Sequence, residues 1–356
     1  MRWLGPVAFL AVVVAACGDA GETETTPVGG SGGAPYDGAP IPWAYAPFPA
    51  VVEPADNLST PAKIELGNLL FYDPVLSRDD ATACATCHSE IWGMSDGLPV
   101  SVGVDGEGPT GPGRDGPNKT TRNAQTLWNA AFRPALFLDG RSPGLEQQAL
   151  EPLRALQELA LDPDAAALKL ASFPEYVTLF AAAFPDDPSP VNAANLARAL
   201  SAFQRTLVSD QAPYDQYVAG DEGALIPSVV EGMFLFGEAG CATCHVPPLF
   251  ESDRYVSRIG GPDPGRAAVT GDDADAGAVR VPTFHDGSVM TLEDAVRLEA
   301  EISAARGEGR ALSESEIDLV VKFVNKALVD RTRDPHRPKT VPSGLQVPLD
   351  GFRLQR

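Results

Sequence analysis

The sequence is poor in several kinds of residue, and each scarcity excludes a class of protein. Its 356 residues include only four histidines, four methionines, four tryptophans and five cysteines. Lys and Arg number 27 against 48 Asp and Glu, which gives a net charge of −21. This sign argues against nucleic-acid binding, which depends on cationic side chains, and would repel an anionic membrane surface. The 44% hydrophobic content is ordinary for a globular protein, and the length favours two domains.

One apolar run stands out, and it lies at the start of the chain. Arg2 precedes an apolar stretch that continues to Ala16, which is too short to span a bilayer and is typical of a signal peptide. Small residues then lead to Cys17, as in lipoprotein signals. We predict a signal peptide at residues 1–16, a lipid on Cys17 and a flexible tether at 17–40. A plain secretory signal with an incidental Cys17 is the alternative, and both predict export.

The other four cysteines form two identical motifs. Cys84-Ala85-Thr86-Cys87-His88 and Cys241-Ala242-Thr243-Cys244-His245 both have the pattern C-x-x-C-H. Two thiols one helical turn apart can bond the two vinyl groups of one porphyrin, while the adjoining imidazole reaches the iron. The motifs therefore predict two covalent c-type haems with His88 and His245 as iron ligands. A zinc site or a redox disulfide is the alternative, but neither requires histidine at the same offset twice.

The remaining pattern is mostly helical. Apolar spacing predicts helices over the ranges 62–71, 144–160, 164–172, 191–209, 227–238, 291–304 and 313–328. Thr291 and Ser313 begin capping signatures for the last two helices, and residues 97–118 are expected to form a loop because they are rich in Gly and Pro. We predict a mostly α protein with two cytochrome-c-like haem domains in tandem, one at 41–215 and one at 216–356.

A series of short segments accompanies the haem motifs. They are Glu65-Leu66-Gly67, Leu70-Phe71-Tyr72-Asp73, Leu76-Ser77, Arg122-Asn123-Ala124, Leu127-Trp128-Asn129-Ala130, Phe137-Leu138-Asp139-Gly140-Arg141, Leu145-Glu146-Gln147-Gln148-Ala149, Ala202-Phe203-Gln204-Arg205-Thr206-Leu207, Val281-Pro282-Thr283 and Phe284-His285-Asp286-Gly287. In order and wording they resemble the bacterial di-haem cytochrome c peroxidase family, which includes MauG and MbnH. The resemblance covers roughly residues 55 to 330.

The resemblance implies a division of labour between the two haems. In that family the N-terminal haem is the peroxide site and the C-terminal haem relays electrons to it. The family's distal glutamine matches Gln148, its loop proline Pro152 and its catalytic glutamate Glu158. A carboxyl group suits this role, because cleaving hydrogen peroxide requires a proton to move from one oxygen to the other.

Two departures from the family pattern concern the first haem. Many members carry a histidine sixteen residues after the first haem histidine, and it blocks the iron until reductive activation. Val104 occupies that position here, so the resemblance implies a first haem that is five-coordinate or water-bound without activation, as in MauG-like proteins. The family's inter-haem tryptophan corresponds to Leu138, which cannot relay electrons. Trp128 is a substitute nearby in sequence, although we expect it to be a core residue.

The second half departs further. The family has about ten further residues between the positions of Thr283 and Phe284, and they include calcium ligands; this chain lacks them. Asn123 matches another calcium ligand of the family. Whether a Ca²⁺ ion binds between the two haems is therefore left open. The position of the family's sixth ligand to the second haem is Glu299, and Met290 is the other candidate. His285 is expected to form hydrogen bonds near this haem rather than to bind iron.

The sequence therefore predicts a di-haem c peroxidase on the periplasmic side of a bacterial membrane, held there by a lipid. Its partners would be hydrogen peroxide and a small redox protein, a cytochrome c or a cupredoxin, which donates electrons. A MauG- or MbnH-like oxidase that modifies side chains of a partner protein is the alternative in the same fold. A non-catalytic di-haem electron carrier is the alternative of another class. A homodimer is left open.

Overall fold

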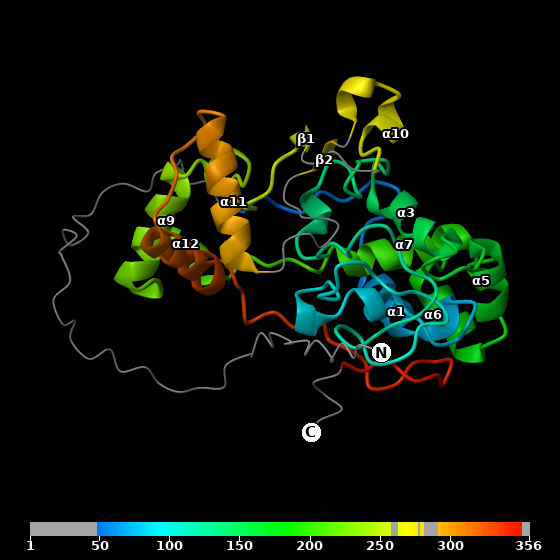
Figure 1. The fold of residues 1–356 in the computed structure, drawn as a ribbon. Helices are drawn as coiled ribbons and strands as arrows, with labels where there is room; N and C mark the ends of the chain where they lie inside the picture. The colour runs from blue at the N-terminus through cyan, green and yellow to red at the C-terminus, as the bar shows by residue number, and fades with distance from the viewer. Residues whose placement is uncertain (1–47, 258–262, 277, 281–290, 351–356) are drawn as a thin grey trace, which may run out of the picture. The chain divides into compact units, whose positions relative to one another are not determined.

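The computed structural model describes residues 48–257, 263–276, 278–280 and 291–350. The predicted signal peptide, Cys17, the tether, His285 and Met290 lie outside the described residues. Within them the regular secondary structure is mainly helical, as the sequence predicted (Figure 1). The α-helices are α1 Pro61–Tyr72, α2 Cys84–Cys87, α3 Leu145–Gln148, α4 Glu151–Arg154, α5 Pro163–Leu170, α6 Pro174–Ala183, α7 Ala193–Gln204, α8 Pro213–Val218, α9 Pro227–Glu238, α10 Ala267–Thr270, α11 Leu292–Ala305 and α12 Glu314–Ala327.

Strand structure in the described part of the chain is limited to one antiparallel pair. It joins β1 Tyr255–Ser257 to β2 Ala278–Arg280, with Val256 opposite Val279. No helix among the described residues is long and apolar enough to cross a membrane.

The predicted capping residues begin their helices. Thr291 accepts a hydrogen bond from the Asp294 amide at the start of α11. Ser313 caps α12 and exchanges both capping-box hydrogen bonds with Glu316. These contacts satisfy amide groups that the first turn of a helix leaves without partners.

The predicted helix over 144–160 is wrong in its extent. The structure has two four-residue helices there, α3 and α4, and no helix at 155–160. Pro152 has no amide hydrogen and therefore cannot donate to the carbonyl of Gln148, which interrupts the helical ladder. Ala155 is extended, with φ −66° and ψ 118°. The chain leaves the helical path there, and Glu158 lies in the loop that follows.

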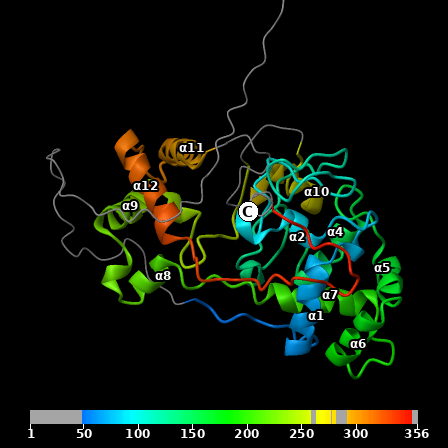
Figure 2. The same ribbon diagram turned by 90° about the horizontal axis from the view of Figure 1, so that it is seen from below.

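The first hydrophobic core is built by α1, α5, α6 and α7, which lie together in Figures 1 and 2. Phe71, Tyr72 and Phe203 are buried in it and their rings contact one another. Val341 and Val347, from the C-terminal part of the chain, belong to the same core. This core therefore includes residues from beyond the predicted domain boundary at 215.

The second hydrophobic core is built by α8, α9, α11 and α12. Its centre is aromatic, with Phe323 against Phe236 and Tyr214. The two cores share one packing device. A Cβ on Gly67 of α1 would lie 2.0 Å from the Ala199 carbonyl oxygen of α7, and a Cβ on Gly232 of α9 would lie 2.0 Å from the Leu319 carbonyl oxygen of α12. In each core, glycine lets the helix before the haem motif approach a later helix closely.

Candidate functional site

The first C-x-x-C-H motif forms a single helical turn. Cys84 and Cys87 bound α2, and His88 is the residue that ends it. The His88 amide donates to the Cys84 carbonyl at 2.9 Å, and Thr86 Oγ1 accepts from the Ala83 amide at 2.9 Å. The turn therefore presents both sulfur atoms and the imidazole from one short, hydrogen-bonded segment.

The His88 imidazole is held in the form that binds iron. Its Nδ1 lies 3.0 Å from the carbonyl oxygen of Met94. A carbonyl oxygen only accepts, so Nδ1 carries the proton and Nε2 keeps a lone pair for a metal. Burial lowers the pKa of His88, which favours the neutral ring.

A cavity of about 840 Å³ opens beside this turn. It is lined by Cys87, His88, Gln148, Pro152 and Glu158, together with apolar side chains and with polar and charged ones. A smaller cavity of about 60 Å³ shares these five residues and adds Cys84. The structure thus brings the three residues singled out on the family resemblance to the cavity that contains the haem motif. The size lies within the range of cofactor sites.

The donor set fits covalent haem better than zinc. Burial raises the pKa of the Cys84 thiol to about 12, and it raises the pKa of Cys87 as well. Both sulfurs are therefore uncharged thiols in the free chain. In the described part of the chain no group of three or more Cys, His, Asp and Glu side chains could hold a metal ion. The two cysteine pairs thus do not converge on one zinc site.

The loop that carries Glu158 is anchored through its backbone. The Val104 amide donates to the Glu158 carbonyl at 2.8 Å, and the Arg78 amide donates to the Leu159 carbonyl at 2.9 Å. A Cβ on Gly103 would lie 2.0 Å from the Gln157 carbonyl oxygen. Only glycine permits this approach, so the segment 101–104 holds the Glu158 loop against the cavity.

The charge on Glu158 is controlled by burial and by two charged neighbours. Burial raises the pKa of this carboxyl group, the positive charge of Arg141 opposes the rise, and Glu151 adds to it. Arg141 also lines the cavity. A carboxyl group with a raised pKa can both accept and return a proton near neutral pH.

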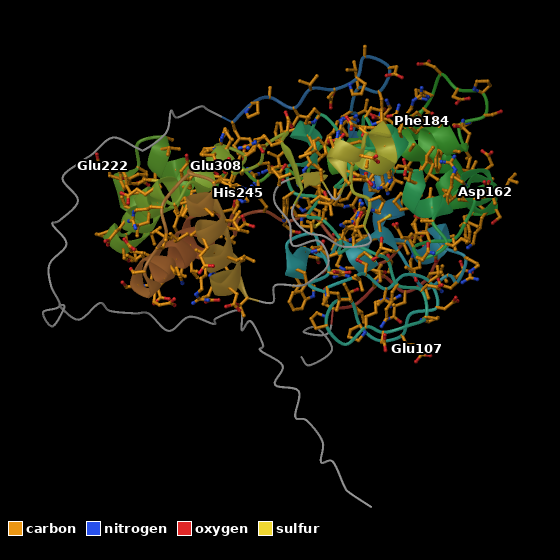
Figure 3. All side chains as sticks on the ribbon, turned by 45° about the horizontal axis from the view of Figure 1, so that its top comes forward. Glu107, Asp162, Phe184, Glu222, His245 and Glu308 are labelled. Atoms are coloured by element: carbon orange, nitrogen blue, oxygen red, sulfur yellow. The ribbon has the colours of Figure 1, made fainter. Side chains whose placement is uncertain are left out.

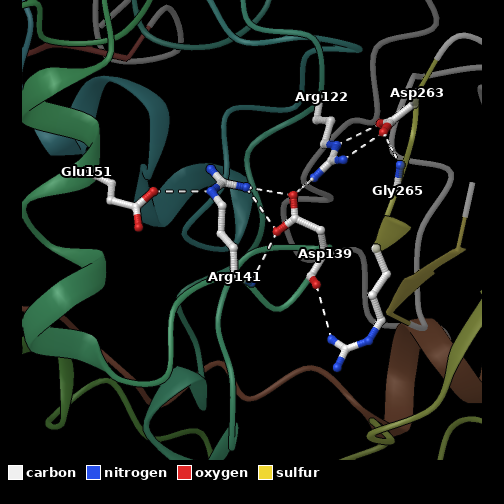
Figure 4. Close-up of polar contacts among 7 residues, drawn as sticks. Arg122, Asp139, Arg141, Glu151, Asp263 and Gly265 are labelled. Atoms are coloured by element: carbon white, nitrogen blue, oxygen red, sulfur yellow. Dashed lines mark hydrogen bonds and ion pairs between the residues drawn. The ribbon is translucent and has the colours of Figure 1, made fainter. Parts of the chain in front are cut away.

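Arg141 belongs to a chain of ion pairs (Figure 4). It donates to Glu151 at 3.1 Å and to both oxygens of Asp139, at 2.9 and 3.0 Å. Asp139 also accepts from Arg122, which forms a two-pronged pair with Asp263 at 2.7 Å. Sequence reasoning missed Asp263 entirely, because 141 residues separate it from Arg122 and no local pattern marks it.

The residues that depart from the family pattern, and those named with them, are all buried or half-buried. Val104 is fully buried, and Leu138 is buried at the cavity wall. Trp128 is half-buried and packs against the first core. Glu299 is half-buried on α11. The Oδ1 atom of Asn123 is buried without a hydrogen-bond partner within the described residues.

The second motif repeats the arrangement of the first. Cys241 begins a short 3₁₀ turn after α9, and the His245 amide donates to its carbonyl at 2.8 Å. Figure 3 labels His245, whose Nδ1 atom lies 3.1 Å from the Phe250 carbonyl oxygen. Burial raises the pKa of the Cys241 thiol to about 11. In both motifs, therefore, a backbone carbonyl oxygen orients the histidine ring through Nδ1.

Two such motifs on a helical chain, each with its histidine oriented by a carbonyl group, define a di-haem protein of the cytochrome c type. The sequence pattern of the family described as "Di-haem cytochrome c peroxidase" matches residues 61–223. The chain is 34% identical to cytochrome c551 peroxidase of Pseudomonas aeruginosa over 281 residues, which cover 73% of this chain and 77% of that protein. The chain belongs to the di-haem cytochrome c peroxidase family.

MauG proteins are as similar to this chain as the peroxidase is. The methylamine utilization protein MauG of Methylorubrum extorquens is 34% identical over 259 residues, which cover 68% of this chain and 70% of that protein. The solved structure of a MauG-like protein associated with microbial copper homeostasis superimposes with a TM-score of 0.67 at 25% identity. It covers 83% of this chain and 99% of that chain. The family therefore unites peroxidases and MauG proteins around one fold.

Proposed function

We propose that the chain reduces hydrogen peroxide to water in the cavity beside His88, with Glu158 as the proton-transfer group. The family's peroxidases support the reaction. The observation that carries the assignment of residues is the shared cavity: His88 and Glu158 line one space large enough for a cofactor. Each peroxide consumes two electrons and two protons and yields two molecules of water.

The roles of the residues follow from their chemistry. When bound, the haem held by Cys84, Cys87 and His88 supplies iron that binds peroxide and passes electrons to it. Glu158 accepts a proton from one peroxide oxygen and returns it to the other. Gln148 orients the peroxide through its side-chain amide, and Pro152 fixes the first turn of α4, the short helix that leads into the Glu158 loop.

The second haem is assigned to Cys241, Cys244 and His245, as the relay for electrons. We propose tandem cytochrome-c-like domains at 41–215 and 216–356, with Val341 and Val347 of the C-terminal segment packed in the first core. The repeated glycine contact between helices and the repeated histidine–carbonyl pair support them. Glu299 or Met290 is the proposed sixth ligand of this haem. The buried Asn123 Oδ1 supports a calcium site.

The cellular setting is part of the proposal. Residues 1–17 are proposed to direct export and to place a lipid on Cys17, so that the enzyme acts on the periplasmic side of a bacterial membrane. The electron donor is proposed to be a small basic redox protein, since the chain carries a net charge of −21. Acidic side chains such as Glu107 and Glu222 are exposed at the surface (Figure 3).

A MauG-like oxidation of a partner protein is the second candidate function. The observation that favours it is Val104. This residue cannot bind iron, it is fully buried, and its amide group holds the Glu158 loop. A first haem with no blocking side chain would react with peroxide without prior activation. The similarity to MauG supports this candidate too.

One set of spectra separates these functions. Optical and EPR spectra of the purified protein are recorded, and peroxide is then added with and without a reduced cytochrome c. We expect a high-spin haem in the resting protein and rapid oxidation of the cytochrome. A high-spin haem that reacts with peroxide but oxidises no cytochrome would favour the MauG-like function. A wholly low-spin, peroxide-inert protein would overturn both and leave an electron carrier.

A further inference from the structure

The segment 333–350 returns from α12 to the first core (red in Figure 2). Val341 and Val347 are buried there. The Ser343 hydroxyl donates to Asp73 at 2.6 Å, and the Tyr176 hydroxyl donates to the same fully buried carboxylate at 2.6 Å. This contact ties the middle of the segment to α1 and α6.

The far end of the segment carries a second buried carboxylate, Asp350, which is 0% exposed. Arg337 donates to Asp350 at 2.8 Å and to Glu90 at 3.1 Å, and only 7% of the Arg337 side chain is exposed. Arg337 also donates to the Pro348 carbonyl. Asp350 also accepts a hydrogen bond from the hydroxyl group of Ser89.

Ser89 directly follows the haem ligand and controls the loop that orients it. Its amide donates to the Ser95 carbonyl at 2.8 Å, and its carbonyl accepts from the Met94 amide at 2.7 Å. The Met94 carbonyl in turn accepts from His88 Nδ1. A continuous set of hydrogen bonds thus runs from Arg337 through Asp350, Ser89 and Met94 to the imidazole.

We propose that Asp350 and Arg337 are positioning residues for His88, which fix the Ser89–Ser95 loop and thereby the hydrogen bond from the imidazole to the Met94 carbonyl. The proposal rests on the proposed function only in taking His88 as the iron ligand. Breaking a buried ion pair leaves an uncompensated charge, so this arrangement resists displacement. The bond from Nδ1 raises the basicity of the ring and strengthens its bond to iron.

The test uses the full-length protein with both haems attached. Ser89→Ala removes the hydroxyl group that joins the loop to Asp350, and Asp350→Asn removes the charge. Resonance Raman spectra of the reduced protein report the iron–histidine stretching band of a five-coordinate haem, and a redox titration reports its potential. We expect a lower stretching frequency and a higher potential in both variants, with a roughly 10-fold loss of peroxide turnover.

Ser343→Ala is the matched control, because it loosens the same segment at its contact with Asp73. We expect it to lower the unfolding temperature and to leave the stretching band unchanged. Ser89→Thr, which keeps a hydroxyl group, should restore the wild-type band. An unshifted band in Ser89→Ala, or an equal shift in Ser343→Ala, would overturn the positioning role. A wild-type protein without an iron–histidine band would contradict the proposed function instead.

Discussion

Glu158 is the residue on which the proposed chemistry depends. It lines the cavity with His88, and burial raises its pKa. Glu158→Gln keeps the shape of the side chain and removes its ability to take up a proton. We expect peroxide turnover to fall by about 10² to 10⁴-fold while the optical spectra of both haems stay unchanged. Steady-state turnover with a reduced cytochrome c measures the effect.

Glu65→Gln, at an exposed position on α1, is the control for that substitution. It should turn over like the wild type. Turnover of Glu158→Gln at the wild-type rate would show that another group moves the proton.

Arg141 should set the pH at which the enzyme becomes active. Glu158 must be ionised to accept a proton, so kcat/KM falls as the pH drops through its pKa. Burial raises that pKa, and Arg141 holds it down. Arg141→Gln removes the opposing charge, so we expect the acid limb of the pH–rate profile to move to higher pH.

Arg141→Lys keeps the positive charge and is the matched control. Its acid limb should stay close to that of the wild type, measured over the same pH range. Identical acid limbs in the glutamine and lysine variants would mean that Arg141 does not influence the proton-transfer group.

At the scale of elements, the segment 101–104 holds the Glu158 loop. A Cβ on Gly103 would meet the Gln157 carbonyl oxygen at 2.0 Å and the Glu158 carbonyl oxygen at 2.6 Å. In Gly103→Ala the loop must therefore move. We expect turnover to fall at least 10-fold, since small misplacements of a catalytic group are costly. Gly223→Ala is the control, because its φ is not positive and a Cβ there would meet only the flexible Asp221 side chain, at 3.3 Å. Equal activity of Gly103→Ala and the wild type would contradict the anchoring.

Asp215, near the start of α8, should make the second core sensitive to pH. Burial raises its pKa to about 6, although it accepts a hydrogen bond from the Ala212 amide. A raised pKa means that the folded state favours the protonated form. Stability is therefore lost as the pH rises from about 4 through 6. Asp215→Asn has no group that ionises at this position and should not lose this stability. The unfolding temperature of Asp215→Asn minus that of the wild type should therefore increase as the pH rises from about 4 to 6. Circular dichroism melts at several pH values measure it, with Asp221→Asn as the exposed control. A difference independent of pH would contradict the assignment.

The elements show which parts of the structure a sequence can predict. Helices with a strong apolar pattern and a cap, such as α11 and α12, were found within one or two residues. The break at Pro152 was missed, because apolar spacing continues across a position where the hydrogen-bond ladder cannot. The cavity brings Gln148 and Glu158 together, as the family resemblance implied. Asp263 and Asp350 were missed, because their partners lie 141 and 261 residues away along the chain.

At the scale of the whole molecule, the excess of negative charge should govern encounters with the electron donor. A net charge of −21 attracts a basic protein over long distances, and salt screens that attraction. We expect kcat/KM for a basic cytochrome c to fall several-fold as the ionic strength rises from about 0.01 to 0.15 M. The rate with a small neutral reductant should not change. A salt-independent rate with the basic donor would contradict electrostatic docking.

The return of the chain's C-terminal part to the first core also dictates an order of folding. Val341 and Val347 complete a core whose other members begin at Leu66. Contacts this distant along the chain close late, because their loop entropy must be overcome first. The first hydrophobic core therefore stays incomplete until almost the whole chain has been synthesised. We therefore expect haem attachment to the first cysteine pair to precede the contact between Ser89 and Asp350 that holds the Ser89–Ser95 loop.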